Sequence, residues 1–152
     1  MPESSCPESP KSAATMTLKQ QRPEIESQLM TLCRQGYALH DKGDFKNALR
    51  KFYSAWALLP KPQSQWVEAT WVLTALGDAY YSKGDYENSQ RALNSALYCP
   101  EGMGNPVIHI RLGQCLSELG DNDAARAEFG KACEHGGETL VLAQDERYLA
   151  LL

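Results

Sequence analysis

Apolar residues recur along most of this chain at intervals of three and four positions. The first series contains Ile25, Leu29, Leu32 and Leu39, which would share one face of an α-helix. Further series follow, each bounded by residues typical of helix ends, such as glycine, proline, asparagine and aspartate. The pattern therefore predicts six helices and an all-α fold. They are expected at about residues 23–42, 45–58, 64–83, 86–98, 106–119 and 122–135.

Three pairs of glycines interrupt these helices, and the two members of each pair are always seven residues apart. The pairs are Gly36 and Gly43, Gly77 and Gly84, and Gly113 and Gly120. The first glycine of each pair lies inside a helix, where it costs about 1 kcal/mol relative to alanine unless it allows a second helix to approach closely. The second precedes an aspartate, so a left-handed glycine can end one helix and the aspartate can cap the next. We therefore predict three helical hairpins.

These hairpins resemble tetratricopeptide repeats in three units that agree in register over about residues 29–137. The residues that carry the resemblance are Leu32, Gly36, Leu39, Gly43, Ala48, Phe52, Ala55 and Pro60, then Leu73, Leu76, Gly77, Tyr80, Gly84, Leu93, Ala96 and Pro100, and finally Leu112, Gly113, Leu116, Gly120, Ala125, Phe129 and Ala132. The chain departs from the family pattern at Ser89, His109 and Gly137. The resemblance implies an all-α, right-handed superhelical solenoid of three hairpins with a C-terminal capping helix.

The domain organisation expected from this resemblance has three parts. Residues 1–22 form a disordered or loosely ordered tail, with a docking arm as the alternative, and the first helix begins at Pro23. Residues 23–137 hold the repeats, at about 29–62, 70–103 and 106–137. Residues 138–152 cover the apolar face of the last hairpin as one or two short helices, broken near Gln144 and Asp145.

The first two repeats are 41 residues apart, seven more than the usual repeat length, and the second and third are 36 apart. The extra residues are placed within 61–69, partly as a loop and partly as two added turns of the third helix, capped by Ser64. Of the tryptophans on this extension, Trp71 is the better candidate for exposure. Gly77→Leu is expected to damage the fold more than Gly102→Leu, because Gly102 is placed in a loop.

Composition and charge narrow the possible partners. The formal net charge is −4 and the pI is near 5.4, which disfavours nucleic acid and anionic membranes as partners. No apolar run approaches the roughly 20 residues that a membrane helix needs. Five cysteines without C-x-x-C spacing are typical of reduced thiols, so a cytoplasmic location is expected.

The chain shows no arrangement of residues that indicates catalysis. His40, His109 and His135 fall on different units without metal-ligand spacing, and no nucleophile elbow, phosphate-binding loop or H-E-x-x-H motif is present. We therefore expect no catalytic residue, no metal site and no cofactor. A binding protein is a better interpretation than an enzyme.

The resemblance also implies a binding surface, because the first helix of each repeat lines the concave groove of such a solenoid. The residues expected to face this groove are Met30, Cys33, Tyr37, His40 and Asp41, then Trp71, Thr74, Asp78, Tyr81 and Ser82, and then Val107, Ile110, Gln114, Ser117 and Glu118. Ten of these are the candidate partner-binding residues: Met30, Tyr37, His40, Asp41, Trp71, Thr74, Asp78, Tyr81, Gln114 and Glu118. The aromatics would anchor a protein or peptide, and Asp41, Asp78 and Glu118 favour a basic one. Alternatively, the C-terminal tail folds back into the groove.

Several functional roles remain open for such a module. Of the positions matching a family clamp for chaperone C-terminal carboxylates, only Arg111 fits, so that subclass is rejected. The segments 105–114 and 147–149 resemble small stand-alone bacterial repeat proteins associated with rearrangement-hotspot toxins. That resemblance implies an immunity protein or an accessory binding protein. The alternatives are a general scaffold, a secretion or assembly chaperone, and the specificity subunit of an enzyme complex.

Overall fold

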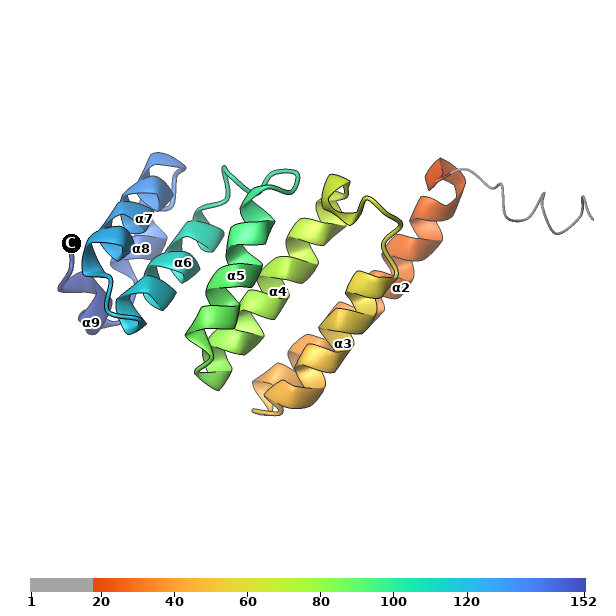
Figure 1. The fold of residues 1–152 in the computed structure, drawn as a ribbon, viewed down its shortest axis with the longest axis horizontal. Helices are drawn as coiled ribbons and strands as arrows, with labels where there is room; N and C mark the ends of the chain where they lie inside the picture. The colour runs from red at the N-terminus through yellow and green to blue at the C-terminus, as the bar shows by residue number, and fades with distance from the viewer. Residues whose placement is uncertain (1–17) are drawn as a thin grey trace, which may run out of the picture.

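Paired helices stack side by side through the described part of the chain (Figure 1). The structure is a computed structural model, which describes residues 18–152; within that range it contains helices and no strand. The helices are α2 (Leu18–Asp41), α3 (Phe45–Ala57), the 3-10 helix η2 (Gln63–Gln65), α4 (Val67–Lys83), α5 (Tyr86–Leu97), α6 (Pro106–Glu118), α7 (Asn122–Glu134), α8 (Glu138–Leu142) and α9 (Glu146–Leu149). The hairpins α2–α3, α4–α5 and α6–α7 form a solenoid with α8 and α9 at its C-terminal end, which confirms the predicted fold class.

The turn within each hairpin is built from the same two residues. Gly43, Gly84 and Gly120 have φ angles of 82°, 88° and 90°, in the left-handed region that glycine adopts without strain. The aspartate after each of them caps the next helix, because its side chain accepts a hydrogen bond from the backbone N–H three residues later. The predicted turn chemistry is confirmed in all three hairpins.

The first glycine of each pair marks the closest approach of the two helices in a hairpin. A Cβ atom on Gly36 would lie 2.4 Å from the Phe52 ring. A Cβ on Gly77 would lie 2.6 Å from Leu93, and one on Gly113 would lie 2.5 Å from Phe129. Since these large side chains are fully buried, any residue larger than glycine would push the helices apart.

Two departures from the family pattern are buried polar residues whose hydrogen bonds join neighbouring elements. Ser89 donates from Oγ to the backbone oxygen of Gly77 at 2.7 Å, within the α4–α5 hairpin. In the third hairpin, His109 has Nδ1 2.7 Å from a carboxylate oxygen of Glu128 and Nε2 2.8 Å from the backbone oxygen of Met103. Burial of these polar groups is tolerable because their hydrogen bonds are made.

The expectation that residues 18–22 belong to a loose tail is wrong, because α2 already begins at Leu18 and Pro23 lies inside it. Arg22 fixes this first turn: its Nη2 lies 2.9 Å from Oε1 of Glu68, and its guanidinium covers the Trp66 ring. Glu68 is only 1% exposed, so its carboxylate requires this cation. The rest of the expected tail, residues 1–17, lies outside the described residues.

The inserted segment between the first two hairpins also differs from the prediction. Ser64 lies within η2 and caps nothing, while α4 begins only at Val67, with Trp66 at the N-cap position and no side-chain cap. The extra residues are therefore mostly a loop with one 3-10 turn. Trp66 is buried in the core, which gives this uncapped helix start a hydrophobic anchor, and Trp71 is exposed as predicted.

The C-terminal segment covers the end of the solenoid. Val141 on α8 and Tyr148 on α9 are 1% and 2% exposed and belong to the cluster around Phe129. The ring of Tyr148 meets that of Phe129 edge to face at 6.3 Å. The two short helices are separated near Gln144 and Asp145, where the sequence predicted a break.

Helix-interior glycines offer a direct test of the close approach. Gly77→Ala should lower the free energy of unfolding by about 1–3 kcal/mol, because the new methyl group overpacks Leu93. Gly130→Ala is the matched control: Gly130 lies in α7 with open space at its Cβ position, so stability should rise by up to about 1 kcal/mol. Urea unfolding measures both, and equal effects would contradict the packing role of Gly77.

Gly102 is not the permissive loop position that the sequence predicted. A Cβ there would lie 2.0 Å from the backbone oxygen of Ala96, so Gly102→Leu should also be strongly destabilising. This is why Gly130 replaces it as the control.

Removal of residues 138–152 should destabilise the protein and promote self-association, because it exposes Phe129 and the apolar face of the last hairpin. Thermal unfolding and light scattering measure the two effects. A monomeric truncated protein with an unchanged melting temperature would show that α8 and α9 are dispensable for the fold.

Candidate functional site

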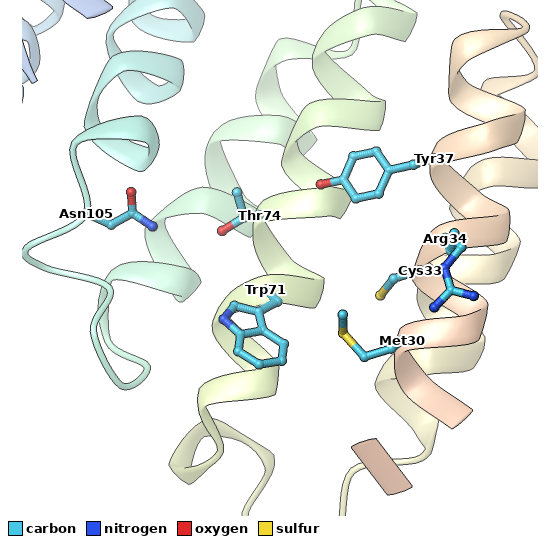
Figure 2. Close-up of a pocket in the computed structure, with 7 residues that line it drawn as sticks. All are labelled: Met30, Cys33, Arg34, Tyr37, Trp71, Thr74 and Asn105. Carbon is cyan, nitrogen blue, oxygen red and sulfur yellow. The ribbon is translucent and has the colours of Figure 1, made fainter. Parts of the chain in front are cut away.

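The first helices of the hairpins line one face, and its N-terminal half is an open cleft between α2 and α4 (Figure 2). This anchor cleft has a volume of about 470 Å³. Its lining residues are Met30, Cys33, Arg34, Tyr37, Trp71, Thr74 and Asn105. Figure 2 shows Met30, Cys33 and Tyr37 projecting from α2 toward Trp71 and Thr74 on α4, with Arg34 lying along α2 and Asn105 at the start of α6.

The lining of the anchor cleft is mostly apolar and remains accessible. Met30, Tyr37 and Trp71 are 43%, 39% and 41% exposed, although large apolar side chains usually lose most of their surface on folding. Burial raises the pKa of the Cys33 thiol to about 11, so this group is neutral at physiological pH. Arg34 is the one charged lining residue, and its guanidinium has no ion pair within residues 18–152.

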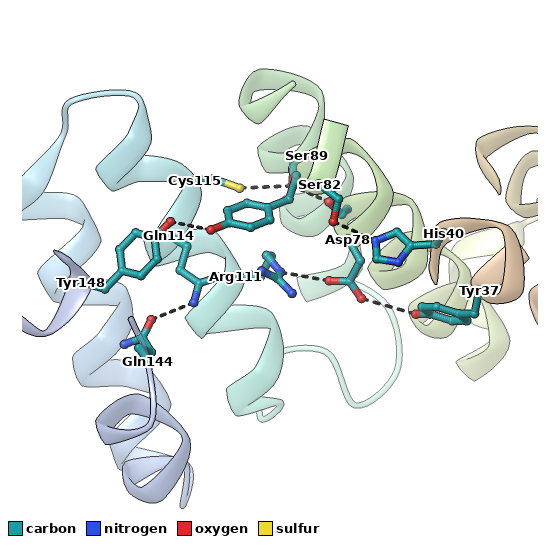
Figure 3. A network of polar contacts seen from close by, with 12 residues as sticks. Tyr37, His40, Asp78, Ser82, Ser89, Arg111, Gln114, Cys115, Gln144 and Tyr148 are labelled. Atoms are coloured by element: carbon teal, nitrogen blue, oxygen red, sulfur yellow. Dashed lines mark hydrogen bonds and ion pairs between the residues drawn. The ribbon is translucent and has the colours of Figure 1, made fainter. Parts of the chain in front are cut away.

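A chain of polar contacts crosses the middle of the same face (Figure 3). Arg111 on α6 donates from Nε to Asp78 on α4 at 3.0 Å, and the hydroxyl of Tyr37 donates to the other Asp78 oxygen at 3.4 Å. Arg111 also donates to Gln114, whose amide reaches Gln144 in the C-terminal segment at 2.9 Å. Burial raises the pKa of the Asp78 carboxyl above its ordinary value of 3.8, and Arg111 opposes that shift.

The far end of this face is occupied by Tyr148 from α9. Its hydroxyl donates to Glu118 at 2.8 Å and accepts from the hydroxyl of Tyr81. Arg147 adds an ion pair to the same Glu118 oxygen at 3.2 Å. Burial, together with these hydrogen bonds, raises the pKa of Tyr148, so the phenol stays protonated and can donate. We call these contacts, with those of Arg111 and Gln114, the tail network.

The predicted site residues therefore separate into three groups. Met30, Tyr37, Trp71 and Thr74 line the anchor cleft together. Four others belong to the tail network and are held by this chain's own residues: Asp78, Tyr81, Gln114 and Glu118. His40 and Asp41 lie at the C-terminal end of α2, where His40 Nε2 is 2.8 Å from the Ser82 hydroxyl and Asp41 is exposed.

The sequence left two alternatives for this face, an open groove and a groove filled by the C-terminal segment. Each describes one half of the face. The anchor cleft is open, whereas the C-terminal segment occupies the surface of the third hairpin. Even there a smaller cleft of about 300 Å³ remains between α6 and α8. Its apolar lining includes Val107, Ile110 and Leu140, and Arg111, Gln114 and Gln144 of the tail network also line it. Of the three candidate aromatic anchors, Tyr37 and Trp71 are therefore available, whereas Tyr81 lies beneath the guanidinium of Arg111.

Sequence reasoning missed several residues that line the two clefts, among them Arg34, Asn105 and Leu140. Arg34 is one position after Cys33 on α2, and a wider stripe of groove-facing positions would have included it. Asn105 was recognised only as a helix cap, which it is, since its side chain accepts from the N–H of Val107. Leu140 required the fold of the C-terminal segment, which no local pattern specified.

Comparison with known proteins agrees with this architecture. Residues 72–98 and 107–134 match the family model described as tetratricopeptide repeat. The chain therefore contains tetratricopeptide repeats. Those matches cover the second and third hairpins, and the first hairpin has the same glycine contact and Gly-Asp turn.

The repeat protein is also similar to curated and structurally solved relatives. It is 26% identical over 115 residues to the photosystem I assembly protein Ycf3 of Synechococcus elongatus, covering 72% of this chain and 64% of that protein. Among solved structures, PcrH bound to the chaperone-binding region of PopB is 21% identical, with a TM-score of 0.67 over 84% of this chain and 96% of that one. The Yersinia enterocolitica secretion chaperone SycD with a YopD peptide is 15% identical, with a TM-score of 0.66 over 81% and 91%.

The described residues contain no further grouping that suggests chemistry. Residues 18–152 hold no set of three or more histidine, cysteine or acidic side chains placed for a metal ion. Over the same residues, no helix combines the length and apolar character required to cross a membrane. On the face formed by the first helices, the two clefts and the tail network are the features that bear on binding.

A double-mutant cycle can measure how strongly the ion pair between Asp78 and Arg111 stabilises the fold. We expect Asp78→Asn and Arg111→Gln to show a coupling energy of about 0.5–3 kcal/mol in the free energy of unfolding. The control cycle uses the exposed pair Asp123 and Arg126, for which coupling should stay below about 1 kcal/mol. Additive effects of the Asp78 and Arg111 substitutions would contradict the pairing.

The raised pKa of Asp78 predicts how the stability of the protein depends on pH. Because the pKa of Asp78 is raised in the folded state, the folded protein binds more protons than the unfolded one, and stability falls as pH rises through that pKa. Arg111→Gln removes the opposing cation, so the fall between mildly acidic and neutral pH should become larger. Urea unfolding across this pH range tests it, and a smaller fall would contradict the assignment.

Proposed function

We propose that this chain is a non-catalytic interaction module that binds a segment of a partner protein, with the anchor cleft as its main contact. The observation that carries the proposal is the joint exposure of Met30, Tyr37 and Trp71 around one cleft between α2 and α4. Clustered exposure of large apolar side chains usually marks a partner surface. Aromatic residues are also enriched among those that dominate binding energy.

The similar proteins support a role in escorting another protein. PcrH and SycD are described in complex with segments of PopB, PopD and YopD, and Ycf3 is described as an assembly protein. The chain spans 64% of the length of the curated relatives, so their whole activity is not carried over. An assembly or secretion chaperone is the specific role we favour.

The charge of the partner follows from which acidic residues remain available. Asp78 and Glu118 are already engaged by Arg111, Arg147 and Tyr148, so the prediction of a basic partner now depends mainly on Asp41. At the anchor cleft itself, apolar side chains should provide most of the contact. The cytoplasmic location remains a prediction from the sequence.

The alternative roles can be separated by what the chain captures. An immunity protein for a bacterial toxin should recover one toxin domain from its native host and neutralise it. A specificity subunit should recover a catalytic partner and change its substrate preference. A chaperone should recover a client and keep it soluble, and mass spectrometry after co-purification distinguishes these outcomes.

Trp71→Ala tests the anchor cleft once the partner has been recovered. If Trp71 is an energetic anchor, its truncation should weaken binding by at least about 2 kcal/mol, measured by calorimetry. Tyr98→Ala is the control, because Tyr98 is a highly exposed aromatic residue outside the cleft lining. Unchanged affinity for a folded Trp71→Ala protein would show that the partner binds elsewhere.

A further inference from the structure

A third cavity lies on the opposite side of α4 from the anchor cleft. This second-helix pocket has a volume of about 330 Å³. It is lined by Tyr53, Trp56, Leu73, Leu76, Tyr80, Asn88, Arg91, Ala92 and Ser95, from α3, α4 and α5. On α4, Leu73, Leu76 and Tyr80 follow a helical stripe about half a turn away from Trp71 and Thr74, so the two cavities use different faces of one helix.

The pocket has an apolar floor and an aromatic wall. Leu73 and Leu76 are buried beneath it, and Trp56 is half-buried at its side. Tyr53 stands at the rim with 48% of its surface exposed. Across from these large residues, α5 presents the small side chain of Ala92, which leaves the hollow between the two second helices unfilled.

The polar residues that line this pocket offer hydrogen-bond donors, and no aspartate or glutamate is among the lining residues. The hydroxyls of Tyr53 and Tyr80 are 2.6 Å apart, so one donates to the other and a single phenolic proton remains free. Burial, followed by the hydrogen bond with Tyr53, raises the pKa of Tyr80, so its phenol stays protonated. Ser95 adds a hydroxyl to the same lining.

Arg91 gives the pocket its charge. It is the only charged lining residue, it is exposed, and within residues 18–152 it forms no ion pair, including none with Glu87 one turn earlier. On α3, Lys46 and Arg50 continue the stripe of Tyr53 at helical spacing, and Lys46 and Arg50 likewise have no ion pair in the described residues. Asp44 lies near Lys46 and Arg50, and Asp85 lies near Tyr80, so the charge that complements an anion is that of Arg91 in the pocket lining.

We propose that the second-helix pocket is a separate docking site for an acidic protein segment in which a carboxylate stands beside a large apolar side chain. The apolar side chain would lie on Leu73 and Leu76 between Trp56 and Ala92. The carboxylate would receive paired hydrogen bonds from the Arg91 guanidinium and a further one from a phenol or Ser95. This site does not depend on the anchor cleft, so one chain could hold two partners or two segments of one partner.

A titration of the full-length, ¹⁵N-labelled protein with short blocked peptides tests the proposal. The probe is a pentapeptide with a central phenylalanine flanked by two aspartates and ended by glycines, at up to millimolar concentration. We expect saturable amide shifts at Tyr53, Arg91 and Ser95. Versions with asparagine or lysine in place of aspartate should bind at least tenfold more weakly.

Two substitutions locate the binding and separate it from the anchor cleft. Arg91→Gln should weaken the aspartate peptide at least tenfold, while Arg34→Gln, in the anchor cleft, should leave its affinity unchanged. Both residues are exposed, so both variants should fold. Absence of saturable binding, an unchanged affinity for Arg91→Gln, or shifts confined to the anchor cleft would overturn the proposal.

Discussion

The structure depends on the contact between a bare backbone in one helix and a large side chain in the next. Gly36, Gly77 and Gly113 allow Phe52, Leu93 and Phe129 to press directly against the helix backbone. Each contact sets the spacing of one hairpin, and the Gly-Asp turn seven residues later sets its direction. Since all three hairpins share this geometry, their first helices face the same side and can together form a groove.

The C-terminal segment then determines how much of that groove is available. Tyr148 completes the last apolar cluster by packing on Phe129, and its hydroxyl engages Tyr81 and Glu118. One side chain thus both closes the solenoid and occupies the surface of its third hairpin. Release of this segment would uncover a large apolar face, so the open binding surface is concentrated at the N-terminal half, where residues 18–152 contribute no such closing element.

How far the sequence predicts this structure depends on how local each signal is. The glycine spacing, the aspartate caps and the exposure of Trp71 follow from patterns within a few turns, and they were predicted correctly. The pairs Arg22–Glu68, Arg111–Asp78 and Tyr148–Glu118 join positions 46, 33 and 30 residues apart. No periodicity marks such partners, so the ordered start of α2 and the internal use of Asp78 and Glu118 became visible only in three dimensions.

Helix α4 contributes side chains to two cavities on opposite sides of it. Trp66 anchors its start in the core, and buried residues surround much of its circumference, so its hydrophobicity is not confined to one face. Trp71 and Thr74 project toward the anchor cleft, while Leu73, Leu76 and Tyr80 form the floor of the second-helix pocket. A substitution in α4 can therefore disturb both cavities through packing. Residues on the flanking helices, Arg34 on α2 and Arg91 on α5, touch only one cavity each, which makes them the positions that can assign a binding event to one side.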